Sequence, residues 1–280
     1  MPGVETVGAA LQRARQLLQA LDNGRLDAEV LLAAVTGLGR ETFYSHPERP
    51  LARAHAADFN RLVQRRREGC PVAYLTGRRE FWSLQFKINR DTLIPRPETE
   101  RLVETALEAI PANAALDVLD LGTGSGAIAV ALATERPRCR ITASDISQEA
   151  LAVAAENAAA AGPASITFLE SDWFEVLPPQ AYDLIVCNPP YVESEHAAFS
   201  GDIRFEPRLA LDGGRGGLAA LQCIIPAARR HLRPGGHLLL EHGHDQGGPV
   251  RRLLQLNHYA GIATHLDQAG RERVSAAVLP

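Results

Sequence analysis

The sequence predicts an α/β protein in which a doubly wound, largely parallel sheet follows a small helical domain. Three observations support this. From about residue 115 onward, short apolar runs alternate with helical patterns at the spacing of strand-helix-strand units. A glycine-rich turn, Gly122 to Gly126, joins one expected strand to one expected helix. Residues 1–70 show helical periodicity only.

The first domain, residues 1–70, is expected to be a bundle of short helices. Apolar residues recur at helical spacing, and glycines stand where each helix should stop. Helices are expected over residues 4–21, 27–36 and 52–68. The last of these ends in Arg65-Arg66-Arg67, a favourable position for cations, so we interpret the three arginines as a solvated helix end rather than a nucleic-acid patch.

Residues 71–92 are expected to form a β-hairpin linker between the two domains. Short strand-like runs cover residues 72–75, 81–82 and 84–88, and Gly77 is expected to turn between them. The third segment, residues 93–280, opens with a helix over 98–109 that has acidic residues in its first turn.

The sheet of the 93–280 domain is expected to alternate with helices along the chain. Strands are expected over residues 116–121, 140–144, 166–169, 184–187, 237–241 and 273–279, and helices over 127–134, 148–161, 218–232 and 248–256.

The composition restricts the class of protein. Lys and Arg total 29 against 33 Asp and Glu, a net charge of −4, so stable nucleic-acid binding is not expected. The four cysteines are scattered, which argues against a disulfide framework or a metal site and favours a reducing, cytoplasmic location. The first 20 residues carry Arg13 and Arg15 within their apolar stretch and do not resemble a signal peptide. No apolar run is long enough for a membrane span.

The glycine-rich turn is a candidate nucleoside site. It comprises Gly122, Thr123, Gly124, Ser125 and Gly126, although a tight strand-helix connection alone would also explain it. Asp145 closes the next expected strand, where an acid can accept from both ribose hydroxyls; it could equally cap the following helix. The spacing Gly-x-Gly-x-Gly differs from the Gly-x-Gly-x-x-Gly of dinucleotide sites.

Two further groups of residues follow expected strands. Asp172 can accept from an adenine amino group and Trp173 can pack on a purine, although a solvent-facing turn with a core Trp is the alternative. Asn188, Pro189, Pro190 and Tyr191 follow the strand that ends at Cys187. The two prolines remove backbone donors and leave carbonyl oxygens outside the ladder, while Asn188 adds another acceptor. This tetrad suits a planar NH2 group, and ligands of open α/β sheets bind at such strand ends.

These motifs resemble known enzymes in combination. Asp120-Leu-Gly-Thr-Gly-Ser-Gly126 is similar to the first motif of S-adenosylmethionine-dependent methyltransferases, whose fold is a Rossmann-like sheet. Asn-Pro-Pro-Tyr behind it resembles enzymes that methylate NH2 nitrogens of adenine, cytosine or glutamine. Four more segments resemble the bacterial release factor glutamine methyltransferases, the PrmC/HemK family, over nearly the whole chain: Tyr74-Leu-Thr-Gly77, Leu93-Ile-Pro-Arg-Pro-Glu-Thr-Glu100, Phe205-Glu-Pro-Arg-Leu-Ala-Leu211 and Glu241-His-Gly243.

This resemblance implies methylation of the side-chain N5 of the glutamine in the Gly-Gly-Gln motif of peptide chain release factors, with S-adenosylmethionine as donor and S-adenosylhomocysteine as product. The residues expected to contact the cofactor are Gly122 to Gly126, Asp145, Asp172, Trp173 and Asn188, and those expected to hold the glutamine are Asn188, Pro189, Pro190 and Tyr191, with Asn188 and Pro189 catalytic. We expect a monomer whose residues 1–70 dock the release factor, or merely stabilise the rest. A DNA amino-methyltransferase and a non-catalytic cofactor-binding scaffold are the competing hypotheses.

Overall fold

The computed structural model describes residues 5–162, 165–177, 181–195 and 201–280. The chain divides into two compact units, residues 1–77 and 78–280. The sequence patterns predict a boundary at residue 70 and a separate linker over residues 71–92. Across the described ranges, every helix is too short or too polar to cross a membrane.

Apart from one isolated β-bridge between Thr6 and Pro50, the regular secondary structure in the described part of the first unit is helical. Its helices are α1 (Val7–Leu17), α2 (Gly24–Thr36), α3 (Arg40–Ser45), α4 (Arg53–Arg67) and α5 (Val72–Thr76). Leu11, Leu31 and Phe59 are among the buried residues that form its own core. The side chain of Glu29 on α2 is also buried, and its carboxylate accepts hydrogen bonds from Arg15, Arg40 and the Tyr44 hydroxyl.

The strand expected over residues 72–75 is wrong, because this run is the helix α5. Pro71 precedes it, and the Pro71 carbonyl accepts hydrogen bonds from the Tyr74 and Leu75 amides. Gly77 ends the helix with a φ of 71°. A short apolar run does not distinguish helix from strand. Helix α3 was not predicted at all, because its six residues are too few to show a helical period.

The second unit begins with an antiparallel hairpin of β1 (Arg78–Phe81) and β2 (Leu84–Lys87). Trp82 and Ser83 form its turn, with φ values of 52° and 56°. Left-handed backbone at both central positions matches the twist of a two-residue hairpin. The predicted turn at Gly77 and the predicted strand at Trp82 are therefore wrong.

The main sheet has seven strands in the described part of this unit, in the order β5-β4-β3-β6-β7-β9-β8. Their bounds are β3 (Asp117–Leu121), β4 (Arg140–Asp145), β5 (Ile166–Glu170), β6 (Tyr182–Cys187), β7 (Leu232–Glu241), β8 (Ala260–Leu266) and β9 (Glu272–Val278). Strands β3 to β7 are parallel, whereas β9 runs antiparallel to β7 and β8. Edge strand β8 was not predicted; its side chains are only partly buried or exposed.

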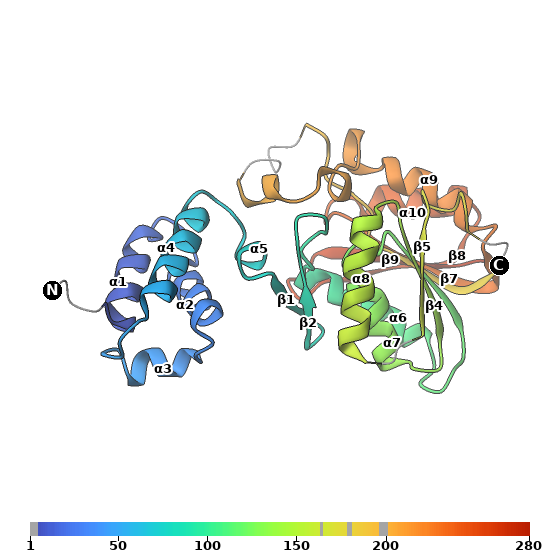
Figure 1. Ribbon diagram of the computed structural model, residues 1–280. Coiled ribbons are helices and arrows are strands. Elements are labelled where there is room, and N and C mark those ends of the chain that lie inside the picture. The colour runs from blue at the N-terminus through green and yellow to red at the C-terminus, as the bar shows by residue number, and fades with distance from the viewer. Residues whose placement is uncertain (1–4, 163–164, 178–180, 196–200) are drawn as a thin grey trace. The chain divides into compact units, whose positions relative to one another are not determined.

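Helices cover both faces of this sheet, which confirms the doubly wound α/β class (Figure 1). One layer contains α6 (Glu100–Ala109), α7 (Ala127–Glu135) and α8 (Gln148–Ala161), and the other α9 (Ala219–Ala228) and α10 (Gly247–Leu256). Short 3₁₀ turns are η1 (Pro97–Thr99), η3 (Gly201–Phe205), η4 (Arg208–Ala210) and η5 (Arg215–Gly217). Helix α9 stops earlier than expected because β7 already begins at Leu232.

The strand order reverses between β3 and β6, the position where open α/β sheets bind ligands. Leu121, the last residue of β3, pairs with Cys187 on β6 and with Ser144 on β4. Gly122, Asn188 and Asp145 each follow one of these paired residues. The register of the sheet therefore brings the glycine turn, Asp145 and the Asn-Pro-Pro-Tyr segment together at the carboxyl ends of the parallel strands.

Candidate active site

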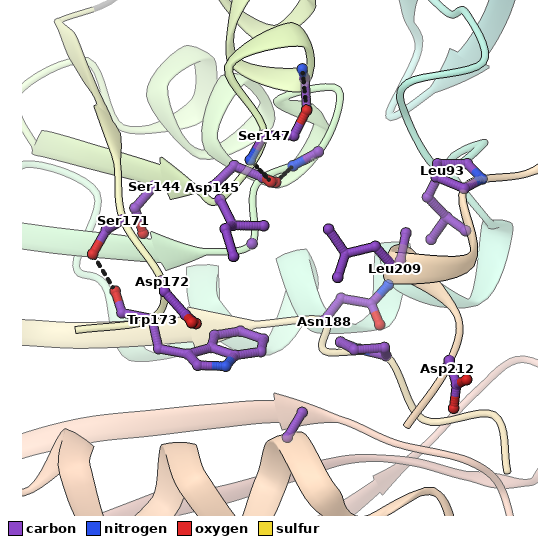
Figure 2. A pocket seen from close by; sticks show the side chains of 18 of the residues that line it. Leu93, Ser144, Asp145, Ser147, Ser171, Asp172, Trp173, Asn188, Leu209 and Asp212 are labelled. Atoms are coloured by element: carbon purple, nitrogen blue, oxygen red, sulfur yellow. Dashed lines mark hydrogen bonds between the residues drawn. The ribbon is translucent and has the colours of Figure 1, made fainter. Parts of the chain in front are cut away.

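A cavity of about 540 Å³ opens at the carboxyl ends of these strands. Seven of the residues that the sequence analysis proposed for the site line it: Gly122, Gly124, Asp145, Asp172, Trp173, Asn188 and Pro190. Figure 2 shows Asp145, Asp172 and Trp173 on one side of the opening and Asn188 on the other. Segments at the carboxyl ends of four strands, β3, β4, β5 and β6, thus line one cavity.

The glycine turn needs left-handed backbone at three positions. Gly122, Gly124 and Gly126 have φ values of 69°, 55° and 80°. Gly122 and Gly124 expose backbone to the cavity, whereas a Cβ on Gly126 would lie 3.0 Å from Ala154 Cβ, so this glycine permits close helix packing.

Thr123 and Ser125, between these glycines, are buried and do not line the cavity. The Thr123 hydroxyl donates to Asp120 Oδ2 at 2.6 Å, and the Ser125 carbonyl accepts from Asn157 Nδ2 at 2.8 Å. Burial raises the pKa of Asp120 to about 7, although the Thr123 hydrogen bond acts in the opposite direction. These two residues hold the turn rather than face a ligand.

Asp145 stabilises the glycine turn from the end of β4. Its Oδ2 accepts from the Gly124 amide at 2.8 Å and its Oδ1 from the Ser147 amide at 3.0 Å. The N-cap of α8 is Ser147, which accepts from the Ala150 amide, so the alternative that Asp145 caps this helix is wrong. Each carboxylate oxygen can accept a further hydrogen bond, because an ionised carboxylate has about four acceptor positions.

Trp173 has left-handed backbone, with a φ of 46°, which is rare for a bulky residue. The Ser171 hydroxyl donates to its carbonyl oxygen at 2.9 Å and holds this turn. The ring lines the cavity and also packs against the core, and Asp172 is exposed at the rim. The turn therefore offers a flat apolar surface beside a carboxylate.

Asn188 sits where the Asn-Pro-Pro-Tyr segment leaves β6. Its Nδ2 donates to Thr99 Oγ1 at 3.2 Å. The side-chain oxygen, at the other end of the amide, is not used by this hydrogen bond. Pro190 lines the cavity, but Pro189 and Tyr191 do not. Tyr191 instead donates its hydroxyl to Glu241 Oε1 at 3.2 Å, and burial raises its pKa. Tyr191, which was expected to help hold the glutamine, therefore does not line the cavity.

Several contacts hold the segment after Asn188 in place. The Tyr191 carbonyl accepts from Gln246 Nε2 at 3.0 Å. Val192 pairs with Asp212 in an isolated bridge, and its amide donates to the Leu211 carbonyl at 2.9 Å. The backbone that follows Asn188 is therefore held in a fixed position.

The remaining cavity residues were not proposed from the sequence. They are Arg90, Asp91, Leu93, Ser144, Ile146, Ser147, Ala150, Ser171, Pro207, Leu209, Ala210, Asp212, Ala219, Ala220 and Cys223. Ile146 directly follows Asp145, so it could have been inferred. Leu93 and Leu209 belong to segments used only for the family resemblance, and Leu209 is 62% exposed.

The cavity wall is acidic. It carries Asp91, Asp145, Asp172 and Asp212 against the single cation Arg90 among the described lining residues. Hydrogen bonds from Ser194, the Gly214 amide and Arg208 lower the pKa of Asp212, which keeps it ionised. Such a wall favours a cationic ligand and disfavours the pyrophosphate of a dinucleotide.

Known protein families match segments in both units of the chain. Residues 9–77 match the family described as the PrmC N-terminal domain, and residues 101–203 match the methyltransferase small domain. The methyltransferase from Pyrococcus furiosus shares the fold of the second unit, with a TM-score of 0.52 and 18% identity over 70% of this chain and 88% of that one. The 16S rRNA N2 G1207 methyltransferase of Thermus thermophilus also shares it, with a TM-score of 0.52 and 20% identity over 72% of this chain and 50% of that one.

Relatives of higher identity match nearly the full length. The release factor glutamine methyltransferase of Salmonella typhimurium is 47% identical over 266 residues, 95% of this chain and 96% of that protein. The release factor glutamine methyltransferase of Escherichia coli is 45% identical over the same shares of the two chains. The chain therefore belongs to the family of release factor glutamine methyltransferases.

Proposed function

We propose that this protein transfers a methyl group from S-adenosylmethionine to the side-chain amide nitrogen of a glutamine in a peptide chain release factor, leaving S-adenosylhomocysteine and releasing one proton from that nitrogen. One observation supports this most: the acceptor Asn188 shares a cavity with the glycine turn and Asp145. The names of the relatives supply the substrate class. The Gly-Gly-Gln glutamine is the target that the sequence resemblance implies.

The residues of the cavity fit S-adenosylmethionine. The cavity volume lies within the roughly 300–1,000 Å³ of small-molecule sites. We assign the ribose hydroxyls to the unused acceptor positions of Asp145 and the purine to the apolar surfaces of Ile146 and Trp173, with Asp172 near the adenine amino group. The backbone of Gly122 and Gly124 leaves room for the cofactor, and the acidic wall suits its positive sulfonium.

Asn188 and Pro189 would orient the substrate amide. When bound, the cofactor supplies an activated methyl group, so the enzyme has to position a weak nucleophile. Asn188 Oδ1 and the Pro189 backbone carbonyl would accept the two NH2 hydrogens, which aims the nitrogen and favours the positive charge that develops on it. Within the described chain, no hydrogen bond to the Pro189 carbonyl is found that would compete.

We also propose that the helical first unit binds the release factor. A single amide on a protein loop offers little surface for recognition, and the family description of residues 9–77 names a separate N-terminal domain. The protein would act as a monomer in the cytoplasm. It would form no stable nucleic-acid complex, in agreement with its net charge of −4.

One assay tests the proposed function against its competitors. The protein is incubated with isotopically labelled methyl donor and either release factor, DNA or neither, and the label is located by mass spectrometry. We expect one methyl group on a release factor glutamine. Label on DNA would indicate an amino-methyltransferase of nucleic acid, and cofactor binding without any transfer would indicate a scaffold; either result contradicts the proposal.

A further inference from the structure

The Gln246 side chain joins three loops beside the cavity. Gln246 lies between β7 and α10, and because β6 and β7 are paired, the loops that follow these two strands leave the sheet side by side. Its Nε2 donates to the Tyr191 carbonyl at 3.0 Å and to the Gly216 carbonyl at 3.2 Å. Its Oε1 accepts from the Gly243 amide at 2.8 Å. The Asn-Pro-Pro-Tyr segment is therefore attached to η5 and to the loop after β7 through one carboxamide.

These partners fix the direction of the Gln246 carboxamide. A backbone carbonyl can only accept a hydrogen bond, and a backbone N–H can only donate one. A half-turn of the amide would place its oxygen against two carbonyl oxygens and its NH2 group against a donor. Only the observed orientation satisfies all three backbone groups, so residue 246 holds the Tyr191 carbonyl only while it offers a donor there.

The backbone packs closely around this amide. A Cβ on Gly217 would lie 2.1 Å from the Tyr191 carbonyl oxygen and 2.4 Å from Gln246 Nε2. A Cβ on Gly243 would lie 3.0 Å from Gln246 Oε1. The absence of a side chain at these two glycines allows the three loops to approach the amide, and it leaves little space for the Tyr191 carbonyl to move toward η5.

The stretch between Tyr191 and Asn188 is stiff. Pro189 and Pro190 fix two of its φ angles, so these torsions cannot absorb a displacement of the Tyr191 carbonyl. A Cβ on Gly213 would lie 2.7 Å from the Pro190 carbonyl oxygen, so this stretch also packs against a neighbouring backbone. A displacement at Tyr191 should therefore reach Asn188, and a misplacement of about 1 Å in a catalytic site can lower the rate about 100-fold.

We propose that Gln246 is a positioning residue for methyl transfer, which holds the Tyr191 carbonyl and thereby keeps Asn188 in place at the cavity. The inference rests on the proposed function, in which Asn188 orients the substrate amide. Gln246 is not among the described residues that line the cavity, so it acts through the segment and not by contact with a ligand. Its replacement should therefore lower kcat with little change in the affinity for cofactor or release factor.

Two substitutions at residue 246 separate positioning from mere space filling. Gln246→Glu keeps the shape and the acceptor oxygen, but at alkaline pH its second, ionised oxygen faces the carbonyls of Tyr191 and Gly216. Gln246→Met keeps the length of the side chain and removes both hydrogen-bonding ends. Repulsion should displace the Tyr191 carbonyl in Gln246→Glu. In Gln246→Met, water can replace the lost donor, because Gln246 is only partly buried.

At alkaline pH, we expect kcat on release factor to fall about 30- to 100-fold in Gln246→Glu and about 3- to 10-fold in Gln246→Met. The KM for release factor and the cofactor Kd should change less than about threefold, which also shows that both variants are folded. Gln255→Glu adds the same charge at an exposed position of α10 and should keep the wild-type kcat. A space-filling role predicts the opposite order, with the isosteric Gln246→Glu as the milder change.

The Asn188 side-chain NH2 resonances of the ligand-free protein give a readout that does not require methyl transfer. They should shift in Gln246→Glu and stay unchanged in Gln255→Glu. Wild-type kcat in Gln246→Glu, a larger loss in Gln246→Met than in Gln246→Glu, or unshifted Asn188 resonances would each overturn the proposal. Absence of transfer by the wild-type protein would contradict the proposed function, whereas the resonances would still decide whether Gln246 sets the position of Asn188.

Discussion

Asn188 has the most specific chemical role of the proposed site residues. Its side-chain oxygen would accept from the substrate amide only as the nitrogen aligns for transfer, so the interaction strengthens in the transition state. We predict that Asn188→Ala lowers kcat about 100- to 1,000-fold, the cost of removing one aligned hydrogen-bonding group from an active site. Steady-state kinetics on release factor would measure this, with calorimetry of the cofactor as the internal control. A variant with near wild-type turnover would contradict the role.

Asp145 has a different task, since its carboxylate organises the cofactor side of the cavity. It already accepts from the Gly124 and Ser147 amides and would accept from ribose hydroxyls. Hydrogen bonds to a charged group contribute about 1.5–3 kcal/mol, so Asp145→Ala should raise the Kd for S-adenosylmethionine about 10- to 100-fold. Isothermal titration calorimetry measures this directly, and an unchanged Kd would exclude the ribose contact.

At the scale of elements, the turn η5 supports the Asn-Pro-Pro-Tyr segment. A Cβ on Gly217 would overlap the Tyr191 carbonyl oxygen, whereas a Cβ on Gly216 would meet nothing within 4 Å. Both glycines have left-handed backbone, with φ values of 67° and 66°, so an alanine strains the backbone similarly at either position. The pair therefore separates steric displacement of the segment from backbone strain.

We predict that Gly217→Ala reduces kcat at least about tenfold more than Gly216→Ala, because even a small misplacement of an orienting group is costly to catalysis. The measurement is turnover on release factor by both variants, with cofactor Kd to confirm that the rest of the site is intact. Equal turnover by the two variants would show that the segment does not need its present position.

The first unit is stabilised by a buried acid on α2. Burial alone would raise the pKa of Glu29, but hydrogen bonds from Tyr44, Arg40 and Arg15 outweigh it and lower the pKa to about 2 from an ordinary 4.5. A depressed pKa contributes stability that is complete above the unfolded value and is lost as pH falls from about 4.5 to about 2. The contribution is at most about 3 kcal/mol, since the arginine partners are partly exposed.

We therefore predict that amides of α1, α2 and α4 lose hydrogen-exchange protection as pH is lowered through this range. Glu29→Gln should reduce both the protection at neutral pH and its dependence on acid. Glu48→Gln is the control, because the Glu48 side chain is 73% exposed. Identical acid profiles for the wild-type protein and Glu29→Gln would contradict the assignment.

The parts of the fold that could be predicted are those with strong local signals. Strands β3 and β6 are buried or nearly so, whereas β4 is partly buried and β5 only partly buried or exposed, and all four show short apolar runs in the sequence. The candidate residues Asp145, Trp173 and Asn188 were found because each stands at or after the end of such a run. Helix α5 was mistaken for a strand because a short apolar run has no clear period. Edge strand β8 lacks a buried face. The cavity residues contributed by the loops around Leu93 and Leu209 depend on tertiary packing, which no local pattern encodes.

The contacts that fix the site join residues far apart in sequence. Asn188 meets Thr99, 89 residues away, and Tyr191 meets Glu241, 50 residues away. The sequence showed the acceptors but not the groups that orient them, because such contacts exist only once the sheet has formed.

At the scale of the whole molecule, the division into two compact units suggests a division of labour. If the helical unit binds the release factor, the intact protein should discriminate strongly between the whole factor and a short glutamine-containing peptide. We predict a kcat/KM at least about 100-fold higher for the whole factor, mainly through KM, because the peptide lacks most of the surface of a stable protein interface. Steady-state kinetics with both substrates measures this, and similar KM values would leave the first unit a purely stabilising role.

A crystal structure with S-adenosylhomocysteine and a glutamine-containing substrate peptide would test most directly whether Asn188 holds the glutamine beside the cofactor. We predict the cofactor product in the cavity with its ribose on Asp145, and the glutamine amide nitrogen within hydrogen-bond distance of Asn188 Oδ1. A cofactor product bound elsewhere, or a glutamine side chain that does not reach Asn188, would contradict the account.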